Sequence, residues 1–356
     1  MPSNNRVIVA AAGSGKTTTI IGEALSFPEE KIAILTYTNN NLNEIKNKFY
    51  QENGFIPENI TIQTWFSFLL DDCVRPYQNY VYGNFRIESL VFVNYRSAKF
   101  ISKTNISQYY LSEKNIYSDK VSEFAILCNT NSDGLVIKRL EKIYTKIYID
   151  EIQDMAGYDL DLIEMIANSK IDLTLVGDNR QATFSTNSSA KNDKYKGFEI
   201  INLFKIWEAS ELFTIDYQSI SYRCSQPICD IADSLYPEMP KTKSLCEKVS
   251  DHDGVFIVSE EQIDDYINKY HPSVLRYDRR TSWHNSDIMN FGESKGLTFQ
   301  RVLIIPNNPI KEFLKTGEIK HVQNEREKLY VAITRAINSV AFLYNGNNGI
   351  ANIKNY

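Results

Sequence analysis

The fold is decided by one stretch, Ala10-Ala11-Ala12-Gly13-Ser14-Gly15-Lys16-Thr17. It overlaps the end of an apolar run, Arg6–Ala12, with the composition of a buried strand. It leads into Thr17–Leu25, whose apolar residues recur at helical spacing. A glycine-rich turn between a strand and a helix is the context of a phosphate-binding loop. Gly13 and Gly15 would let backbone N–H groups face phosphate oxygens at the positive end of the helix.

Strands and helices alternate beyond this loop. Each segment is short, apolar or amphipathic, and separated from the next by polar residues. The predicted order is strand Lys31–Tyr37, helix Asn40–Phe49, strand Lys146–Ile149, helix Leu160–Ala167 and strand Ile171–Val176. Alternation of this kind predicts an α/β fold with a parallel sheet.

Two regions interrupt or follow this first unit. From about Asp71 to about Leu140 the alternation weakens and aromatic residues accumulate, which indicates a small inserted subdomain. A second α/β unit is expected from about residue 206, so the predicted domains are residues 1–205 and 206–356. Its expected elements are strands Val255–Val258 and Val302–Ile305, a helix through Leu329–Ile337 and a strand Val340–Tyr344.

The composition sets outer limits on function. The 356 residues are 43% hydrophobic and 23% charged, as in ordinary globular proteins. A net charge of −5 excludes a histone-like cationic protein but allows a local basic groove. Five cysteines without a CxxC pair favour a reducing cytoplasm. The apolar run at the N-terminus is too short for a membrane span, so no membrane partner is expected.

A second chemical motif ends the strand near residue 150, in the segment Tyr148–Asp154. Asp150 is placed to hold Mg²⁺ together with Thr17, and Glu151 to orient or deprotonate the attacking water. Lys16 would contact the β- and γ-phosphates. The competing interpretations are a chance glycine turn and an ordinary acidic strand end; finding both motifs in one chain makes each of them a minority interpretation.

Six further blocks follow in a fixed order: Leu35–Asn39, Thr64–Ser67, Val176–Gln181, Ser221–Cys224, Gly292–Phe299 and Lys328–Ala336. Together with the two sites above, they resemble the motifs of the UvrD/Rep-type superfamily 1 DNA helicases. The resemblance runs from residue 10 to residue 336, nearly the whole chain. It implies two RecA-like P-loop domains with parallel sheets, with a small insertion in the first.

The resemblance also implies the nucleotide site, with ATP and Mg²⁺ as cofactors. Catalytic roles fall to Lys16, Glu151, Gln181, Arg223 and Arg335. Nucleotide binding falls to Gly13, Ser14, Gly15, Lys16, Thr17, Thr18, Tyr222 and Gly296. Arg223 and Arg335 match arginine fingers contributed by the second unit; the alternative is a surface salt bridge for each. Tyr222 matches a ring that stacks on adenine, against the alternative of a core tyrosine.

Single-stranded DNA or a tailed duplex is the implied partner. The matching residues are Tyr37, Thr38, Asn39, Phe66, Ser67, Phe184 and Lys295, with Trp65 as a further candidate for base stacking. Each aromatic ring has a core position as its alternative.

Several positions depart from the family pattern. Only nine residues precede Ala10, where the family has a segment whose glutamine reads adenine, so selectivity for ATP over GTP stays open. Thr186 stands near the place of a DNA-stacking tryptophan, and Gly292 where a histidine is usual. The 67 residues from Ser225 to Phe291 cannot hold the family's long second-domain insertion.

Three functions remain in competition. The first is an ATP-dependent DNA helicase or single-strand translocase moving 3′→5′. The second is a DNA-responsive ATPase switch that regulates a partner nuclease, for example in anti-phage defence, with little unwinding of its own. The third is a P-loop signalling NTPase or small-molecule kinase, which predicts no arginine finger from the second unit. The oligomeric state stays open.

Overall fold

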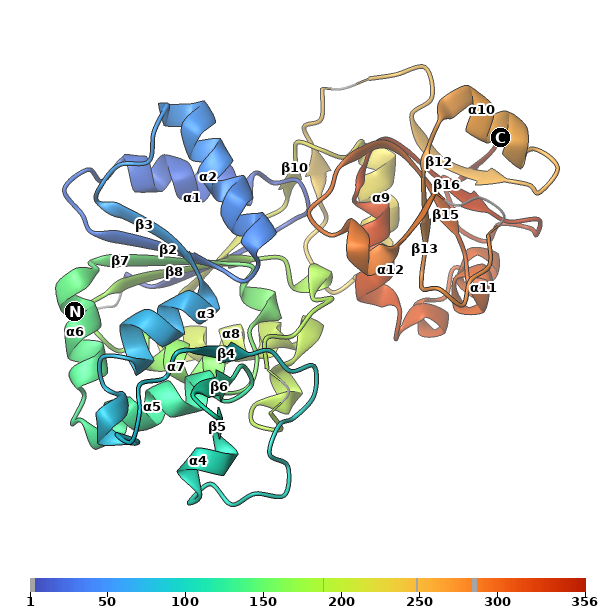
Figure 1. Cartoon of the computed structure of the whole chain (residues 1–356). Helices are drawn as coiled ribbons and strands as arrows, with labels where there is room; N and C mark the ends of the chain where they lie inside the picture. Colours follow the sequence, from blue (N-terminus) through green and yellow to red (C-terminus); the bar gives the residue numbers. More distant parts are fainter. Residues whose placement is uncertain (1–3, 188, 248, 284–286) are drawn as a thin grey trace. The chain divides into compact units, whose positions relative to one another are not determined.

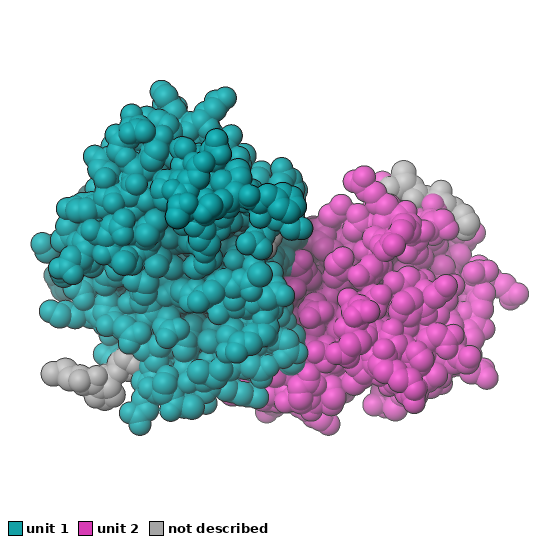
Figure 2. Space-filling model, turned by 90° about the horizontal axis from the view of Figure 1, so that it is seen from below, with its two compact units in different colours: residues 1–9, 16–179, 184–216 teal, residues 10–15, 180–183, 217–356 magenta. Residues whose placement is uncertain are grey.

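The computed structural model describes residues 4–187, 189–247, 249–283 and 287–356. The chain forms two compact units (Figure 2). Unit 1 comprises residues 1–9, 16–179 and 184–216, and unit 2 comprises residues 10–15, 180–183 and 217–356. Two short segments that precede residue 217 in the chain, residues 10–15 and 180–183, therefore belong to unit 2 by their contacts.

Unit 1 is built on a six-stranded sheet within the described residues, in the order β3-β2-β7-β8-β1-β9. The pairs β3–β2, β2–β7, β7–β8 and β8–β1 are all parallel. The strands are β1 (Arg6–Ala10), β2 (Ile32–Thr36), β3 (Ile60–Thr64), β7 (Lys146–Asp150), β8 (Asp172–Gly177) and β9 (Thr214–Gln218). Because the strands are parallel, the ends of β1, β7 and β8 meet at one edge of the sheet, where α/β proteins bind ligands.

Helices cover both faces of this sheet (Figure 1). The helices α1 (Lys16–Leu25) and α2 (Asn39–Asn53) lie on one face, and α7 (Tyr158–Ala167) and α8 (Ile200–Ala209) on the other. The predicted insertion, from about Asp71 to about Leu140, lies within the segment that joins β3 to β7. This segment contains α3 (Trp65–Ser67), β4 (Ser89–Val91), α4 (Ile106–Tyr109), β5 (Leu111–Ser112), β6 (Asn115–Tyr117), α5 (Val121–Asn131) and α6 (Leu135–Ile143).

Unit 2 has a second sheet of six strands in the described chain, in the order β14-β13-β15-β16-β12-β17, and every pair is parallel. Its strands are β12 (Gly254–Val258), β13 (Ser273–Arg276), β14 (Ile288–Asn290), β15 (Phe299–Ile305), β16 (Ala336–Leu343) and β17 (Lys354–Asn355). A small separate ladder pairs β10 (Ile220–Ser221) with β11 (Lys243–Ser244). The predicted class, α/β with parallel sheets in both halves, is confirmed.

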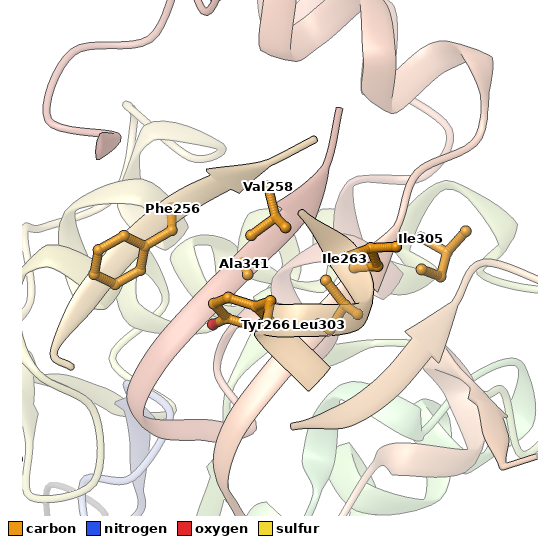
Figure 3. Packing of buried hydrophobic residues seen from close by; sticks show 7 residues of the cluster. All are labelled: Phe256, Val258, Ile263, Tyr266, Leu303, Ile305 and Ala341. Carbon is orange, nitrogen blue, oxygen red and sulfur yellow. The ribbon is translucent and has the colours of Figure 1, made fainter. Parts of the chain in front are cut away.

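The second sheet is also covered on both faces. The helices α9 (Gln226–Ser234) and α12 (Arg326–Ile333) lie on one side, and α10 (Ile263–Tyr270) and α11 (Asn308–Thr316) on the other (Figure 1). Figure 3 shows the core under α10, where Ile263 and Tyr266 pack on Phe256, Leu303 and other apolar residues of β12, β15 and β16. No helix in the described part of the chain is long and apolar enough to cross a membrane.

Most element boundaries differ from the sequence prediction by one to four residues. The first strand ends at Ala10 instead of Ala12, because the glycine turn begins there. The helix predicted through Ile337 ends at Ile333, where Thr334 donates its hydroxyl to the carbonyl of Tyr330, and β16 starts at Ala336. Unit 1 extends to residue 216, because α8 and the first residues of β9 group with it.

Candidate functional site

The phosphate loop leaves the end of β1 and enters α1 at Lys16. Gly13 and Gly15 have φ values of +74° and +83°, which side chains with a Cβ rarely adopt. A Cβ placed on Gly15 would meet no atom within 4 Å, so the loop faces open space there. The buried hydroxyl of Ser14 has no hydrogen-bond partner among the described residues. An open glycine loop with an unsatisfied buried hydroxyl fits the binding of phosphate oxygens.

The first half of this loop is held by the segment around β10. The backbone N–H of Tyr222 donates to the carbonyl of Gly13 at 2.9 Å, and the hydroxyl of Ser221 donates to the carbonyl of Ala12 at 2.8 Å. A Cβ on Gly13 would lie 2.5 Å from the Cβ of Arg223. Only glycine allows this approach, so the loop and the predicted arginine finger are adjacent within unit 2.

The acidic motif lies at the carboxyl end of β7, the strand that pairs with β8. Asp150 is buried, and its Oδ1 accepts the backbone N–H of Glu151 at 2.9 Å. Burial raises the pKa of Asp150 above its usual value, the neighbouring Glu151 carboxylate adds to the rise, and the Lys16 ammonium opposes it. Lys16 and Asp150 are thus electrostatically coupled within unit 1, as a phosphate-binding lysine and a metal-binding carboxylate would be.

Glu151 adopts a left-handed backbone conformation, with φ +58° and ψ +42°. This conformation is costly for a residue with a Cβ and is concentrated at functional sites. Gln153 donates to the Glu151 carboxylate and accepts the N–H of Asp178 at 3.1 Å. Gln153 therefore connects the end of β7 to the end of β8 and fixes the Glu151 side chain.

The oxygen donors near the phosphate loop suit Mg²⁺, which needs few protein ligands. No group of three His, Cys, Asp or Glu side chains that could hold a metal ion occurs in the described ranges. Mg²⁺ is usually held by one or two protein oxygens together with substrate phosphates. Thr17, in the first turn of α1, and Asp150 are the residues that would hold it.

The structure brings Gln181 and Arg335 together in unit 2. The Nη2 of Arg335 donates to Oε1 of Gln181 at 2.9 Å, and both side chains are buried. Its other nitrogens donate to the carbonyls of Val331 and Leu297. Arg223 donates to the carbonyl of Thr334, the residue before Arg335, at 3.3 Å. The side chain of Arg335 is buried, which argues against its interpretation as a surface salt-bridge residue.

The remaining predicted nucleotide residues are exposed. Tyr222 has 58% of its surface exposed, so its interpretation as a core tyrosine is wrong. Thr18 is exposed on the first turn of α1. Gly296 is exposed with φ +87°, in the turn before β15, and Lys295 precedes it. Tyr222, Thr18 and Gly296 are therefore accessible to a ligand.

Two of the predicted DNA residues of unit 1, Tyr37 and Phe66, line an aromatic groove of about 300 Å³, and Phe66 is only 5% exposed. Tyr37, after β2, and Phe66, on α3, have ring centroids 5.7 Å apart. Phe92, after β4, packs edge-on against Phe66 at 5.3 Å. Asn187 and Lys196, from the loop after β8, complete the lining. The sequence did not single out Phe92, although the aromatic richness of the insertion was the available signal.

Some predicted DNA residues also have structural roles. Thr38 caps α2 by accepting the N–H of Asn41, and Asn39 is exposed beside it. The Ser67 hydroxyl lies 2.9 Å from that of Thr64, which caps α3. Phe184 is exposed in unit 1.

Trp65 is a correction to the sequence interpretation. Its surface is fully buried, so it cannot stack on a base. Its Nε1 donates to the buried carboxylate of Asp159, which also accepts the hydroxyls of Ser122 and Thr186. Burial raises the pKa of Asp159, and these hydrogen bonds oppose the rise. Asp159 thus joins α3, the insertion and the loop after β8; no spacing in the sequence indicated this role.

Two known protein families match the sequence of this chain. The family described as an AAA domain matches residues 1–187. The family described as the viral superfamily 1 RNA helicase core domain matches residues 112–344, which is more than half of the chain.

Two curated proteins are similar in sequence. The Gabija protein GajB of Bacillus cereus (strain VD045) is 24% identical, over 92% of this chain and 67% of that protein. The ATP-dependent DNA helicase Rep of Buchnera aphidicola subsp. Acyrthosiphon pisum (strain APS) is 25% identical, over 64% of this chain and 42% of that protein. This chain therefore spans about two thirds of the first relative and less than half of the second.

Among solved structures, the Arterivirus nonstructural protein 10 helicase aligns with 95% of this chain and 59% of its own, at 13% identity and a TM-score of 0.49. The complex of that helicase with DNA gives 95% and 60% coverage, 12% identity and a TM-score of 0.49. With the helicase core family matching across residues 112–344, and the phosphate loop and acidic motif at the ends of parallel strands, the chain belongs to the superfamily 1 helicases.

Proposed function

We propose that this chain is a cytoplasmic, ATP-dependent DNA helicase or single-stranded DNA translocase that moves 3′→5′ and hydrolyses ATP with Mg²⁺. One observation carries the proposal. The phosphate loop, open at Gly15, lies at the same sheet edge as the Asp150–Glu151 pair. That arrangement supports phosphoryl transfer to water more than it supports nucleotide binding alone.

Each residue then has a defined role. Lys16 and the loop N–H groups bind the phosphates, and Thr17 and Asp150 hold the ion, which neutralises charge on the phosphates. Glu151, fixed by Gln153, orients the attacking water and accepts its proton. Arg223 and Arg335 stabilise charge on the transferred phosphoryl group, and Gln181, bonded to Arg335, reports the state of the γ-phosphate.

The DNA side rests on the aromatic groove. Tyr37 and Phe92 offer accessible rings for base stacking, which tolerates any sequence, and the buried ring of Phe66 packs against both of them. Asn39, Thr38 and Ser67 lie at the start of α2 and on α3, where backbone phosphates are expected. Phe184 and Lys295 are assigned to the same strand by the family pattern.

Strand displacement with fluorescent duplexes tests the proposal. The duplexes carry a 3′ tail, a 5′ tail or no tail, and hydrolysis is measured in the same samples. We expect unwinding of the 3′-tailed duplex and strong stimulation of hydrolysis by single-stranded DNA. Hydrolysis indifferent to every nucleic acid would contradict the proposal, and preference for the 5′ tail would contradict the polarity.

The second candidate is a DNA-responsive ATPase switch that regulates a partner nuclease, for example in anti-phage defence. The observation that favours it is the similarity to a Gabija protein over 92% of this chain. The small insertion in unit 1 and the short segment between α9 and β14 also favour it, because they leave little chain to separate strands. DNA-stimulated hydrolysis without strand displacement would select this candidate, and robust unwinding by the chain alone would remove it.

A further inference from the structure

An exposed strip on the insertion combines rings with basic side chains. The aromatic–basic strip consists of Phe92, Tyr95, Arg96, Lys99 and Phe100, in the loop between β4 and α4 (Figure 1). Tyr95 is 69% exposed and Phe100 is 94% exposed. Large exposed rings are costly in a monomer unless they meet a partner. The strip is therefore a candidate interaction surface.

The charge of the strip is unusual for this acidic chain. No Asp or Glu occurs between Glu88 and Glu113, while the whole chain has a net charge of −5. Arg96 and Lys99 have no carboxylate partner among the described residues. Lys103, by contrast, is paired with Glu123 and is not part of the strip. Two uncompensated cations beside exposed rings match a polyanion whose bases are unpaired.

The strip is held in place by its neighbours. Ser97, in its middle, is buried, and its N–H and hydroxyl both donate to Asp119, at 2.9 and 2.5 Å. The N–H of Val93 donates to the hydroxyl of Ser118 at 3.1 Å. These anchors turn the flanking rings and cations outward. A surface fixed before binding loses less conformational entropy when a ligand arrives.

The strip is continuous with the aromatic groove of unit 1. Phe92 belongs to both, since its ring packs on Phe66 at 5.3 Å and lines the groove. A strand whose bases stack in the groove would reach Tyr95 and Phe100 by continuing along the insertion. Duplex DNA hides its base faces, so exposed rings favour a single strand.

We propose that the aromatic–basic strip of the insertion binds single-stranded DNA outside the helicase core, as a continuation of the groove formed by Tyr37, Phe66 and Phe92. This inference rests on the proposed function, because it needs DNA in the groove. The insertion then extends the site along the strand and increases the affinity for longer tails. Binding involves stacking and phosphate contacts, with no sequence preference.

Two double variants of the full chain test the strip. Tyr95→Ala/Phe100→Ala removes the rings, and Arg96→Ala/Lys99→Ala removes the cations. The matched control, Phe55→Ala/Lys142→Ala, removes one exposed ring and one exposed cation elsewhere on unit 1. The probes are fluorescein-labelled oligothymidylates of about 6 and about 16 nucleotides, spanning the usual size of single-strand sites. Melting temperatures check folding.

We expect each test variant to weaken binding of the longer oligonucleotide by about tenfold, with the shorter one and DNA-free hydrolysis unchanged. Removing two phosphate contacts should lower the slope of log affinity against log salt by about 1.4. Unchanged affinity for the longer probe, equal loss in the control, or a blunt duplex competing as well as the single strand would overturn the inference. Wild-type protein that binds no single strand would instead contradict the proposed function.

Discussion

The two parallel sheets have the same number of strands in the described chain but carry their predicted chemistry at opposite ends. In unit 1, the phosphate loop and Asp150–Glu151 follow the carboxyl ends of β1 and β7. In unit 2, Arg335 comes directly before β16 and Gly296 before β15, at the amino ends. In the proposed function, the same architecture is therefore used in two ways, once to bind phosphates and once to present arginines.

The carboxyl ends of the strands in the second sheet also differ from those in the first. A cavity of about 700 Å³ lies where β15 and β16 end, lined by Tyr277, Asn307, Leu343 and others. None of the motif residues lines it. The carboxyl ends of these strands, where α/β proteins usually bind ligands, therefore carry no phosphate loop in unit 2. The chemistry of each unit thus depends on where its motifs lie relative to the strands, and the fold alone does not determine it.

The largest expected effect comes from replacing an arginine at each end of the strands of the second sheet. Arg335→Ala at the amino edge should lower hydrolysis about 10³-fold while nucleotide binding is retained, because charge on the transferred phosphoryl group loses its partner. Arg276→Ala, at the carboxyl end of β13, is the matched control and should leave hydrolysis unchanged. Steady-state hydrolysis and nucleotide titration measure this. Full activity of Arg335→Ala would favour a kinase-like P-loop protein and would contradict a catalytic role for the amino ends of the strands in unit 2.

Glutamates provide the next test, one at the carboxyl edge of each sheet. Glu151→Gln should bind ATP normally and lower turnover about 10²-fold, because the amide cannot accept a proton from water. Glu260→Gln, beside the cavity of unit 2, should have no effect. Single-turnover hydrolysis is the measurement. Turnover of Glu151→Gln near the wild-type rate would remove Glu151 as the base.

Asp159 tests whether the carboxyl side of the first sheet is more tightly organised than its amino side. Asp159→Ala leaves buried donors on Trp65 and Thr186 unsatisfied and should lower the free energy of unfolding by about 2 kcal/mol. Asp172→Ala removes a partly exposed ion pair with Lys146 at the start of β8 and should cost under about 1 kcal/mol. Denaturant unfolding measures both, and equal losses would contradict this view of Asp159.

The smallest effect concerns His252, near the amino end of β12. Its ring is stacked between Phe256 and Tyr270, each at 3.9 Å. Burial lowers the pKa of His252 to about 4, and the nearby Arg301 adds to the fall. The unfolded chain therefore binds a proton at higher pH than the folded chain does, so the stability is full above about pH 6.5 and falls as the pH is lowered toward 4.

His252→Phe keeps a stacked ring without a titrating group, so melting temperature should depend less on pH between about 6.5 and 4. His271→Asn, at the exposed end of α10, is the control and should keep the wild-type dependence. An unchanged pH profile in His252→Phe would show that the ring is not held neutral.

Local patterns predicted most of the scaffold. The glycine turn, the apolar strands and the acidic strand end are each encoded by consecutive residues, so Lys16, Asp150 and Glu151 were found directly. The end of α12 was misplaced, because apolar residues continue through Ala336 and Ile337 into β16 without a break in the pattern. A helix and a buried strand share that composition.

Contacts between distant residues were beyond the sequence. Trp65 is of a residue type that often stacks on bases, yet its indole is buried and donates a hydrogen bond to Asp159, 94 positions away. The Arg335–Gln181 bond joins residues 154 positions apart, and only the family pattern suggested that they cooperate. Phe92 carried no motif at all. Burial and long-range hydrogen bonding decide these roles, and neither has a local signature.

The central claim is that one chain couples the phosphate loop to single-stranded DNA. Its most direct test is the rate of ATP hydrolysis with and without oligothymidylate, for the wild type and for Lys16→Ala. The account predicts strong stimulation in the wild type and no hydrolysis in Lys16→Ala under either condition. A wild-type rate that DNA leaves unchanged, or hydrolysis that persists in Lys16→Ala, would contradict it.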